Sequence, residues 1–353
     1  MTTDATTLKE CLGLLGLATS KTEGISKPLA SLLQLITEDG YLYGYTWSTV
    51  HNMKVKIAEC DESFDCLINF ENFYSIIKSC GEGAIELTMN DKSLGIKSAI
   101  MKCKLPIYPI QSGKGMPHPQ DATGDEIDFS NIATVLPVCK AVIKKDFVEE
   151  CYKYIYFGPR GIMATDTDNV ALIAKFFFSE RIILDVRTVE ILNKIGKGKV
   201  DVKSKDKRKK IVVTTDKLTY RAYAHTEEMD NYQYDDFADL FQSGPEHTVK
   251  ISKNTFMQAV NASKLFNYEP RLVFSDKGVF LKVDNSEFIY KISSEACEPF
   301  TYQVSVALLS RMLFVKDDEF TLYYGNCPDG KPSFLRIDSE DIMEIISTEE
   351  DNL

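Results

Sequence analysis

Residues 151–178 read CYKYIYFGPRGIMATDTDNVALIAKFFF, and this stretch predicts a small antiparallel sheet. Its aromatic and β-branched segments suit a pleated surface, and its Gly, Pro, Asp and Asn residues mark the turns between them. The strands and turns that it predicts are, in order, Tyr154–Phe157, Gly158–Gly161, Ile162–Thr165, Asp166–Asn169 and Val170–Phe178. A helical candidate, Ser130–Lys145, precedes them, so the predicted unit is one helix followed by a three-stranded meander.

The same helix-plus-meander pattern occurs six times along the chain, in three pairs, at a period of about 60 residues. The six predicted helices are residues 5–18, Asn69–Cys80, Ser130–Lys145, Asp185–Ile195, Ser252–Phe266 and Ser305–Phe314. Segments rich in Pro and Gly, or in acidic residues, separate the pairs. We therefore predict an α+β fold of three domains, residues 1–112, 127–243 and 244–353, with residues 113–126 as a linker.

A meander with an amphipathic helix on one face cannot bury its apolar side alone, but two copies packed together can. Three such pairs in a row predict a curved plate, with the helices inside and the sheets outside. The plate leaves an unpaired edge strand at each end. Two plates joined end to end would pair these edges and close a ring.

The composition is that of an ordinary soluble protein, with 44% hydrophobic and 26% charged residues. The nine cysteines are scattered without a C-x-x-C pair, which favours reduced thiols and a cytoplasmic location. The sequence has no apolar run long enough to span a bilayer, so we expect no membrane partner. It also shows no signal-peptide pattern at its N-terminus. The net charge of −11 argues against nucleic-acid binding through bulk charge, although a basic face on an acidic body remains open.

Motifs that carry catalytic chemistry were sought in the sequence. It contains no G-x-x-x-x-G-K-[ST] and no G-x-S-x-G. The four histidines, which are His51, His118, His225 and His247, are isolated from one another and from metal-ligand spacing. We therefore expect no enzyme activity, no cofactor and no metal site.

Ten basic residues are candidates for a DNA-binding surface, because they lie on or near the predicted helices while much of the acid lies elsewhere. They are Lys9, Lys21, Lys27, Lys78, Lys140, Lys144, Lys194, Lys197, Lys264 and Arg311. Six helices that share one face would give an acidic body a basic lining. For each residue taken singly, a phosphate contact and a solvated surface charge are both open.

Two segments carry a resemblance to a known family. Lys27–Lys56 is similar to the first meander of the bacterial β sliding clamps, and Met163-Ala164-Thr165-Asp166 matches the Ala-Thr-Asp signature that follows their central hairpin. The family continues with Gly-His-Arg-Leu, where this chain has Thr167-Asp168-Asn169-Val170. The chain resembles these clamps over nearly its whole length, and its divergence makes a phage-encoded clamp one interpretation.

The resemblance implies a sliding clamp, which is the processivity factor of the replicative DNA polymerase. Such a clamp is a head-to-tail homodimer of three-domain subunits that encircles double-stranded DNA without reading its sequence. DNA polymerase and the clamp loader bind it through short, largely apolar peptide motifs. Asp168 replaces a basic position of the family, which favours basic side chains in the partner peptide.

The resemblance also assigns residues by position. The partner-peptide groove would involve Cys151, Tyr152, Thr165, Thr167, Asp168, Asn169, Val170, Leu240, Phe241, Met343, Ile345 and Ile346. The interface between subunits would involve Ile100, Lys102, Leu265, Phe266 and Leu272. Ordinary core or domain-junction packing is the alternative for the apolar members of both sets.

Two other classes of function stay open at this point. One is a β-rich structural or assembly protein, such as a virion component, and the other is an enzyme whose site carries no recognisable motif. The basic segment Lys205–Lys210 is a further open point, since it fits either a solvated hairpin turn or an auxiliary contact with DNA or a loader.

Overall fold

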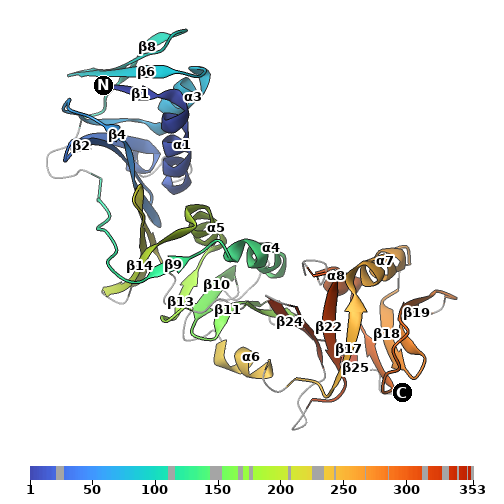
Figure 1. The fold of residues 1–353 in the computed structure, drawn as a ribbon. Helices are drawn as coiled ribbons and strands as arrows, with labels where there is room; N and C mark the ends of the chain where they lie inside the picture. Colours follow the sequence, from blue (N-terminus) through green and yellow to red (C-terminus); the bar gives the residue numbers. More distant parts are fainter. Residues whose placement is uncertain are drawn as a thin grey trace. The chain divides into compact units, whose positions relative to one another are not determined.

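Figure 1 shows the computed structural model of the chain. The structure describes residues 1–20, 28–109, 116–143, 153–165, 170–174, 178–205, 208–224, 234–241, 244–266, 268–284, 286–311, 317–327, 334–339, 342–347 and 349–350. The predicted alternation of helices and three-stranded meanders is confirmed, and each repeat has one additional strand before its helix.

The elements of the six repeats follow in pairs. The first pair consists of β1 (Thr2–Asp4), α1 (Ala5–Leu15), β2 (Leu32–Glu38), β3 (Tyr41–Trp47), β4 (His51–Glu59), β5 (Asp65–Asn69), α3 (Phe70–Ser79), β6 (Ala84–Asn90), β7 (Ser93–Lys97) and β8 (Lys102–Pro106). The second consists of β9 (Glu126–Asp128), α4 (Ile132–Val142), β10 (Ile155–Gly158), β11 (Gly161–Thr165), β12 (Val170–Ala174), β13 (Ile182–Leu184), α5 (Val186–Ile195), β14 (Lys197–Lys205), β15 (Arg208–Thr214) and β16 (Leu218–Tyr223).

The third pair consists of β17 (His247–Ser252), α7 (Lys253–Ser263), β18 (Pro270–Ser275), β19 (Gly278–Val283), β20 (Ile289–Ser293), β21 (Phe300–Gln303), α8 (Val306–Arg311), β22 (Glu319–Tyr324), β23 (Phe334–Asp338) and β24 (Ile342–Ser347). Among the described residues, the 3₁₀ turns Gly16–Ala18 and Pro28–Ser31 lie between α1 and β2, while the helix α6 (Tyr234–Leu240) and the short strand β25 (Glu349–Glu350) lie outside the repeats.

The strand before each helix pairs with the meander of the other repeat in its pair. Thus β1 adds to β6 and β5 adds to β2, and the same exchange joins β9 to β14, β13 to β10, β17 to β22 and β21 to β18. These strands are three to six residues long, too short for alternation to stand out in the sequence. The exchange explains why the repeats come in pairs, since neither sheet is complete without its mate.

Two of the sheets extend beyond a single pair of repeats. One has the strand order β5-β2-β3-β4-β16-β15-β14-β9, and the other β13-β10-β11-β12-β24-β23-β22-β17. Their halves meet at the antiparallel seams β4–β16, where Val55 pairs with Leu218, and β12–β24, where Val170 pairs with Ile346. Two smaller sheets have the orders β1-β6-β7-β8 and β20-β19-β18-β21-β25.

Contacts divide the chain into two units. Unit 1 comprises residues 1–128 and 195–224, and unit 2 comprises residues 129–194 and 225–353. The second predicted domain supplies strands to both units, because each large sheet crosses one of its boundaries. The division into three domains remains a prediction.

In unit 1, α1 packs on one face of the large sheet and against α3 (Figure 1). Asp4 caps α1 by accepting hydrogen bonds from the backbone N–H groups of Thr6 and Thr7 at 2.8 and 3.1 Å. The predicted stripe Leu8, Leu12 and Leu15 is fully buried. Glycine at position 44 of β3 allows this approach, since a Cβ there would lie 2.5 Å from Cδ1 of Leu15.

The predicted linker is ordered over its described part, residues 116–126, and crosses the face of the large sheet opposite to α1. His118 stacks on Tyr45 of β3, with ring centroids 3.8 Å apart. The N–H of Ala122 donates to Oγ1 of Thr214 on β15 at 2.8 Å, and the chain then enters β9. The linker therefore spans the β4–β16 seam, and we name residues 116–126 the strap.

Candidate functional site

Five of the ten predicted basic residues lie at the C-terminal ends of helices. Lys78, Lys140 and Lys194 lie in the last turns of α3, α4 and α5, while Lys264 caps α7 and Arg311 ends α8. The partial negative charge at a helix C-terminus stabilises cations there. The recurrence at equivalent ends of five repeats therefore has a structural cause, and it also places a cation at the same position of each repeat.

Several of these lysines have contacts within the chain. Lys9 on α1 donates to the carbonyl of Gly81 at 2.6 Å, and the ammonium of Lys78 lies 3.9 Å from the ring centroid of Tyr74. Lys140 pairs with Glu190 of α5. Such surface pairs cost little to exchange for a phosphate.

Not every predicted basic residue lies on a helix. Lys197 begins β14, two positions after the end of α5, and pairs with Glu126 at 2.6 Å. Its ion pair with Glu126 raises the pKa of the Lys197 ammonium. Lys21, Lys27 and Lys144 lie outside the described residues.

The structure brings the predicted groove residues of β11, β12 and β24 onto three neighbouring strands of unit 2. Thr165 ends β11 and is buried. Val170 pairs with Ile346, while Met343 and Ile345 pair with the alternate residues of β12. Cys151, Tyr152, Thr167, Asp168 and Asn169 lie outside the described residues.

The strand β24 also pairs with β23 on its other side. Ile346 pairs with Leu335, which is fully buried, whereas Ile345 pairs with the neighbouring residue, Arg336. Adjacent residues of a strand alternate between faces, so Leu335 and Arg336 lie on opposite faces of β23.

Phe241 is held beside this region by Arg336 of β23, whose Nη1 donates to the Phe241 carbonyl at 2.5 Å. The same guanidinium donates to both carboxylate oxygens of Asp338 and lies 4.4 Å from the ring centroid of Tyr323. Leu240, the other predicted member, is the last residue of α6.

The helix α6 lies within a segment predicted to be an acidic connector, so this part of the prediction was incomplete. Tyr234 anchors it: its hydroxyl donates to the carbonyl of Gly161 at 3.0 Å and accepts from the N–H of Arg160 at 3.1 Å. Burial raises the pKa of Tyr234 to about 12. The signal in the sequence was the i, i+4, i+7 spacing of Tyr234, Ala238 and Phe241, all of which are buried.

Ion pairs hold the acidic face of α6 in unit 2. Nη1 of Arg160 lies 2.8 Å from Oδ1 of Asp239, and Nη2 of Arg181 lies 2.9 Å from Oδ2 of Asp235. The hydrogen bond from Arg181 to Asp235 raises the pKa of the guanidinium further. The helix is thus fixed beside the β10–β11 turn, next to the strands that carry the predicted groove.

Four of the five predicted interface residues lie at a surface or sheet edge. Ile100, in the turn before β8, is 73% exposed, and Lys102 begins β8, which has a neighbour on one side only among the described strands. Leu265, after α7, is 85% exposed, and Phe266 packs on Phe288 with ring centroids 4.9 Å apart.

Leu272 is a wrong prediction as an interface residue. It lies in β18 between β19 and β21, and it is fully buried. The sequence analysis missed two exposed residues near Leu265, namely Tyr268 and Ile289. Ile289 begins β20, which also has a neighbour on one side only among the described strands.

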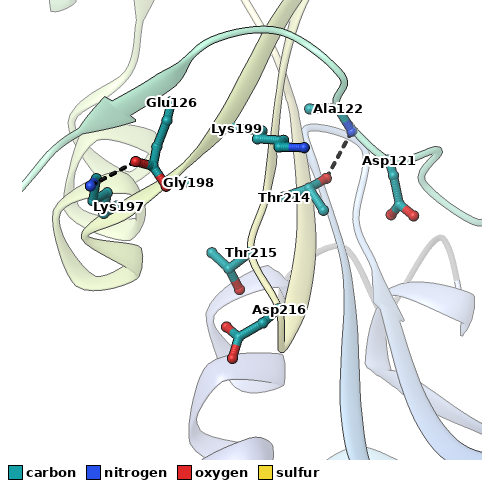
Figure 2. A pocket seen from close by; sticks show the side chains of 9 residues that line it. All are labelled: Asp121, Ala122, Glu126, Lys197, Gly198, Lys199, Thr214, Thr215 and Asp216. Atoms are coloured by element: carbon teal, nitrogen blue, oxygen red, sulfur yellow. Dashed lines mark hydrogen bonds and ion pairs between the residues drawn. The ribbon is translucent and has the colours of Figure 1, made fainter.

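A polar cavity of about 590 Å³ lies in unit 1 between the strap and the β14–β16 strands (Figure 2). It is lined by Asp121, Ala122, Glu126, Lys197, Gly198, Lys199, Thr214, Thr215 and Asp216. Both signs of charge are present, and Lys197 and Glu126 already pair with each other. Over the described residues, no group of three His, Cys, Asp or Glu side chains is arranged to hold a metal ion.

Within the described part of the chain, none of the helices combines the length and apolarity needed to cross a membrane. No protein-family model and no curated protein matches the sequence. Solved structures do match it, over the whole chain and at low sequence identity.

The structure of the Helicobacter pylori beta clamp bound to a DNA ligase peptide is similar over 99% of this chain and 100% of its own, at 17% identity and a TM-score of 0.76. The beta subunit from the DNA polymerase of Streptococcus pyogenes covers 99% of each chain at 10% identity, with a TM-score of 0.76. A putative DNA polymerase III beta subunit from Eubacterium rectale covers 100% of this chain and 99% of its own, at 10% identity and a TM-score of 0.78. The chain therefore has the β-clamp fold, an α+β fold of antiparallel sheets, over its whole length.

Proposed function

We propose that this protein is a DNA sliding clamp: a non-enzymatic ring that encircles duplex DNA and tethers the replicative DNA polymerase for processive synthesis. The full-length likeness to bacterial DNA polymerase β clamps supports this proposal. A β-rich structural protein is the less favoured alternative, because nothing in the described surface calls for it.

The observation that carries the proposal is the pattern of the seams. Both seams within the chain join the last meander strands of two repeats, β4 to β16 and β12 to β24. The last meander strands of the remaining two repeats, β8 and β20, lie at sheet edges. Pairing β8 of one copy with β20 of a second copy repeats the same junction and leaves neither edge open.

Side chains near these two edges support the same pairing. Ile100 precedes β8, whereas Leu265, Tyr268 and Ile289 cluster around β20, and all four are exposed. Isolated exposed apolar residues need no explanation, but their concentration beside the two open edges does. A head-to-tail homodimer would bury them.

The proposed contacts with DNA are the lysines at the helix ends. Lysine–phosphate contacts are independent of base sequence, and a ring that cannot dissociate sideways does not need tight binding. Weak contacts of this kind allow the ring to slide, whereas base-specific hydrogen bonds would stop it.

The proposed partner site is the part of unit 2 formed by β11, β12 and β24, beside α6 and Phe241. The H. pylori clamp holds a DNA ligase peptide, which supports the binding of short peptide motifs by proteins of this fold. A polymerase or a clamp loader would bind this chain in the same way, with an apolar anchor beside Phe241.

The mass in solution tests the ring. Light scattering on a size-exclusion column, over a hundredfold range of concentration, should reach a plateau at twice the chain mass of 39.9 kDa. A mass that keeps growing with concentration indicates an open polymer, and a monomer at every concentration indicates that β8 and β20 do not pair. Either result would refute the proposed closure.

A further inference from the structure

The β14–β15 hairpin carries a charge opposite to that of the chain as a whole. Residues 197–214 contain eight basic and two acidic side chains, a net charge of +6 in a protein of net charge −11. A surface of this kind either binds a polyanion or is a solvated turn. The structure decides between these two possibilities through the placement of the lysines.

The lysines of the hairpin lie opposite one another. Lys203 pairs with Lys210, and Lys205 pairs with Arg208, in the antiparallel register of β14 and β15. Like charges directly opposite each other on a sheet are destabilising. Such a concentration of one sign of charge on a hairpin is what a polyanion would recognise.

The basic row continues onto the next strand. Lys210 pairs with Tyr223 of β16, and the guanidinium of Arg221 lies 5.4 Å from the Tyr223 ring centroid. Strand alternation places Lys203 on the same face as Asp201, whose carboxylate accepts from the N–H of Thr123 in the strap. The row therefore lies on the face opposite to α1, and it does not belong to the helix-end lysines.

The nearby acids are already engaged. Asp201 pairs with Lys203 at 2.9 Å, and this hydrogen bond together with that from Thr123 lowers the pKa of the Asp201 carboxyl despite the opposing effect of burial. Glu126 pairs with Lys197. Counting Glu126 together with the two acids within the hairpin leaves a formal surplus of five positive charges in this region.

The chemistry of the row favours nucleic acid over protein as its occupant. Protein interfaces are poor in lysine and centre on apolar or aromatic side chains. The large hydrophobic side chains that are exposed in the described residues are Met89, Ile100, Tyr108, Leu265, Tyr268 and Ile289, and none lies on this hairpin. Lysine carries a point charge on a flexible side chain, which suits it to bind DNA phosphates independently of the base sequence.

We propose that the face of the β14–β15 hairpin carrying Lys203 and Lys210 binds the phosphate backbone of DNA as a second, external contact. This site does not require a closed ring, because all of its residues lie in unit 1 of one chain. It would hold a strand that passes along the body of the protein.

The test measures binding to short linear DNA, both duplex and single-stranded, by fluorescence anisotropy at increasing salt and without a loader. Each lost phosphate contact lowers the slope of log K against log salt by about 0.9 for a duplex and about 0.7 for a single strand. The variant Lys203→Gln/Lys210→Gln, which alters only that face, should therefore lose a slope of about 1.4 for a single strand and about 1.8 for a duplex, and its affinity should fall at least tenfold at low salt. The strand type with the larger loss is the preferred ligand.

A matched control removes the same charge elsewhere. Lys92 and Lys277 are exposed and lie in turns away from the hairpin, so Lys92→Gln/Lys277→Gln should keep the slope of the wild type. Equal slopes for the hairpin variant and the wild type would overturn the proposal. The proposal would also be overturned if a polyglutamate peptide bound to the hairpin and DNA did not, since the occupant would then be an acidic protein.

A third variant separates this site from the proposed ring. Lys78→Gln/Lys194→Gln/Lys264→Gln alters the helix ends and leaves the hairpin intact. If the hairpin holds DNA, this variant should retain most of the salt slope on short linear DNA. If it loses the slope while the hairpin variant keeps it, the external site is refuted and the sliding-clamp proposal is untouched. Circular dichroism and urea unfolding confirm that all three variants fold.

Discussion

Replacing Ile100 by asparagine should weaken the proposed dimer. Full burial of an isoleucine side chain contributes about 1.5–3 kcal/mol, and Ile100 is 73% exposed in the chain. Its burial against a second copy would therefore contribute about 1–2 kcal/mol at each junction. A closed dimer has two junctions, so the loss is about 2–4 kcal/mol, which raises the dimer Kd by about 30- to 700-fold.

Sedimentation velocity over a dilution series measures this Kd. The control is Met89→Asn, which removes an exposed apolar side chain from β6 in the same sheet, away from the β8 edge. It should leave the Kd within about threefold of the wild type, which corresponds to less than 1 kcal/mol. An unchanged Kd for Ile100→Asn, with an unchanged unfolding curve, would show that Ile100 lies outside the junction and refute the pairing of β8 with β20.

Three further outcomes follow from the structure. Tyr234→Phe should lower stability by about 1–2 kcal/mol, because it leaves the backbone groups of Arg160 and Gly161 without their partner, and it should weaken peptide binding beside α6 in a titration; unchanged values for both would show that α6 is not anchored there. Gly44→Ala should cost about 1–3 kcal/mol in urea unfolding by overpacking against α1, whereas no loss would mean that the helix moves freely. Burial raises the pKa of the Cys66 thiol to about 12, so its stabilising effect is present below the unfolded pKa of about 8.5 and is lost as pH rises towards 12; the free energy of unfolding should fall between pH 8 and 10, and a Cys66→Ser variant that falls equally would contradict this.

Periodicity was sufficient to predict the six helices of the repeats and the meanders, but not α6. Leu8, Leu12 and Leu15 have helical spacing and are buried as a stripe. Paired turn signals such as Gly158–Gly161 mark a real hairpin. These signals are local, so they can be read from the sequence without knowing which other elements each segment contacts.

The exchanged strands and the strap were beyond such reasoning. A strand as short as Thr2–Asp4 has its place fixed by β6, more than 80 residues away, and not by its own residues. Residues 116–126 contain Pro and Gly and read as a linker, but Met116 packs with Tyr45 and orders the segment. Tertiary contacts of this kind override local propensity.

The candidate sites were predicted unevenly for a related reason. Ile100 is exposed and Leu272 is buried, although both are apolar residues in or next to a strand. The sequence alone does not show which of the two is exposed. Strand order does, since β8 is an edge and β18 is not. Lys197 was predicted to lie on or near a helix; one residue separates it from Ile195, the end of α5, and it begins β14.

Retention on circular compared with linear DNA tests the central claim most directly. The protein is loaded with a clamp loader or by spontaneous opening on a nicked circle, washed at high salt to remove ionic contacts, and the circle is then cut once. A sliding clamp should remain on the circle and leave within minutes of cutting, because its link to DNA is topological. Equal retention on both forms after the wash would show that the link to DNA is not topological, and loss from both forms at high salt would show that the chain binds DNA by ionic contacts alone. Either result would contradict the account.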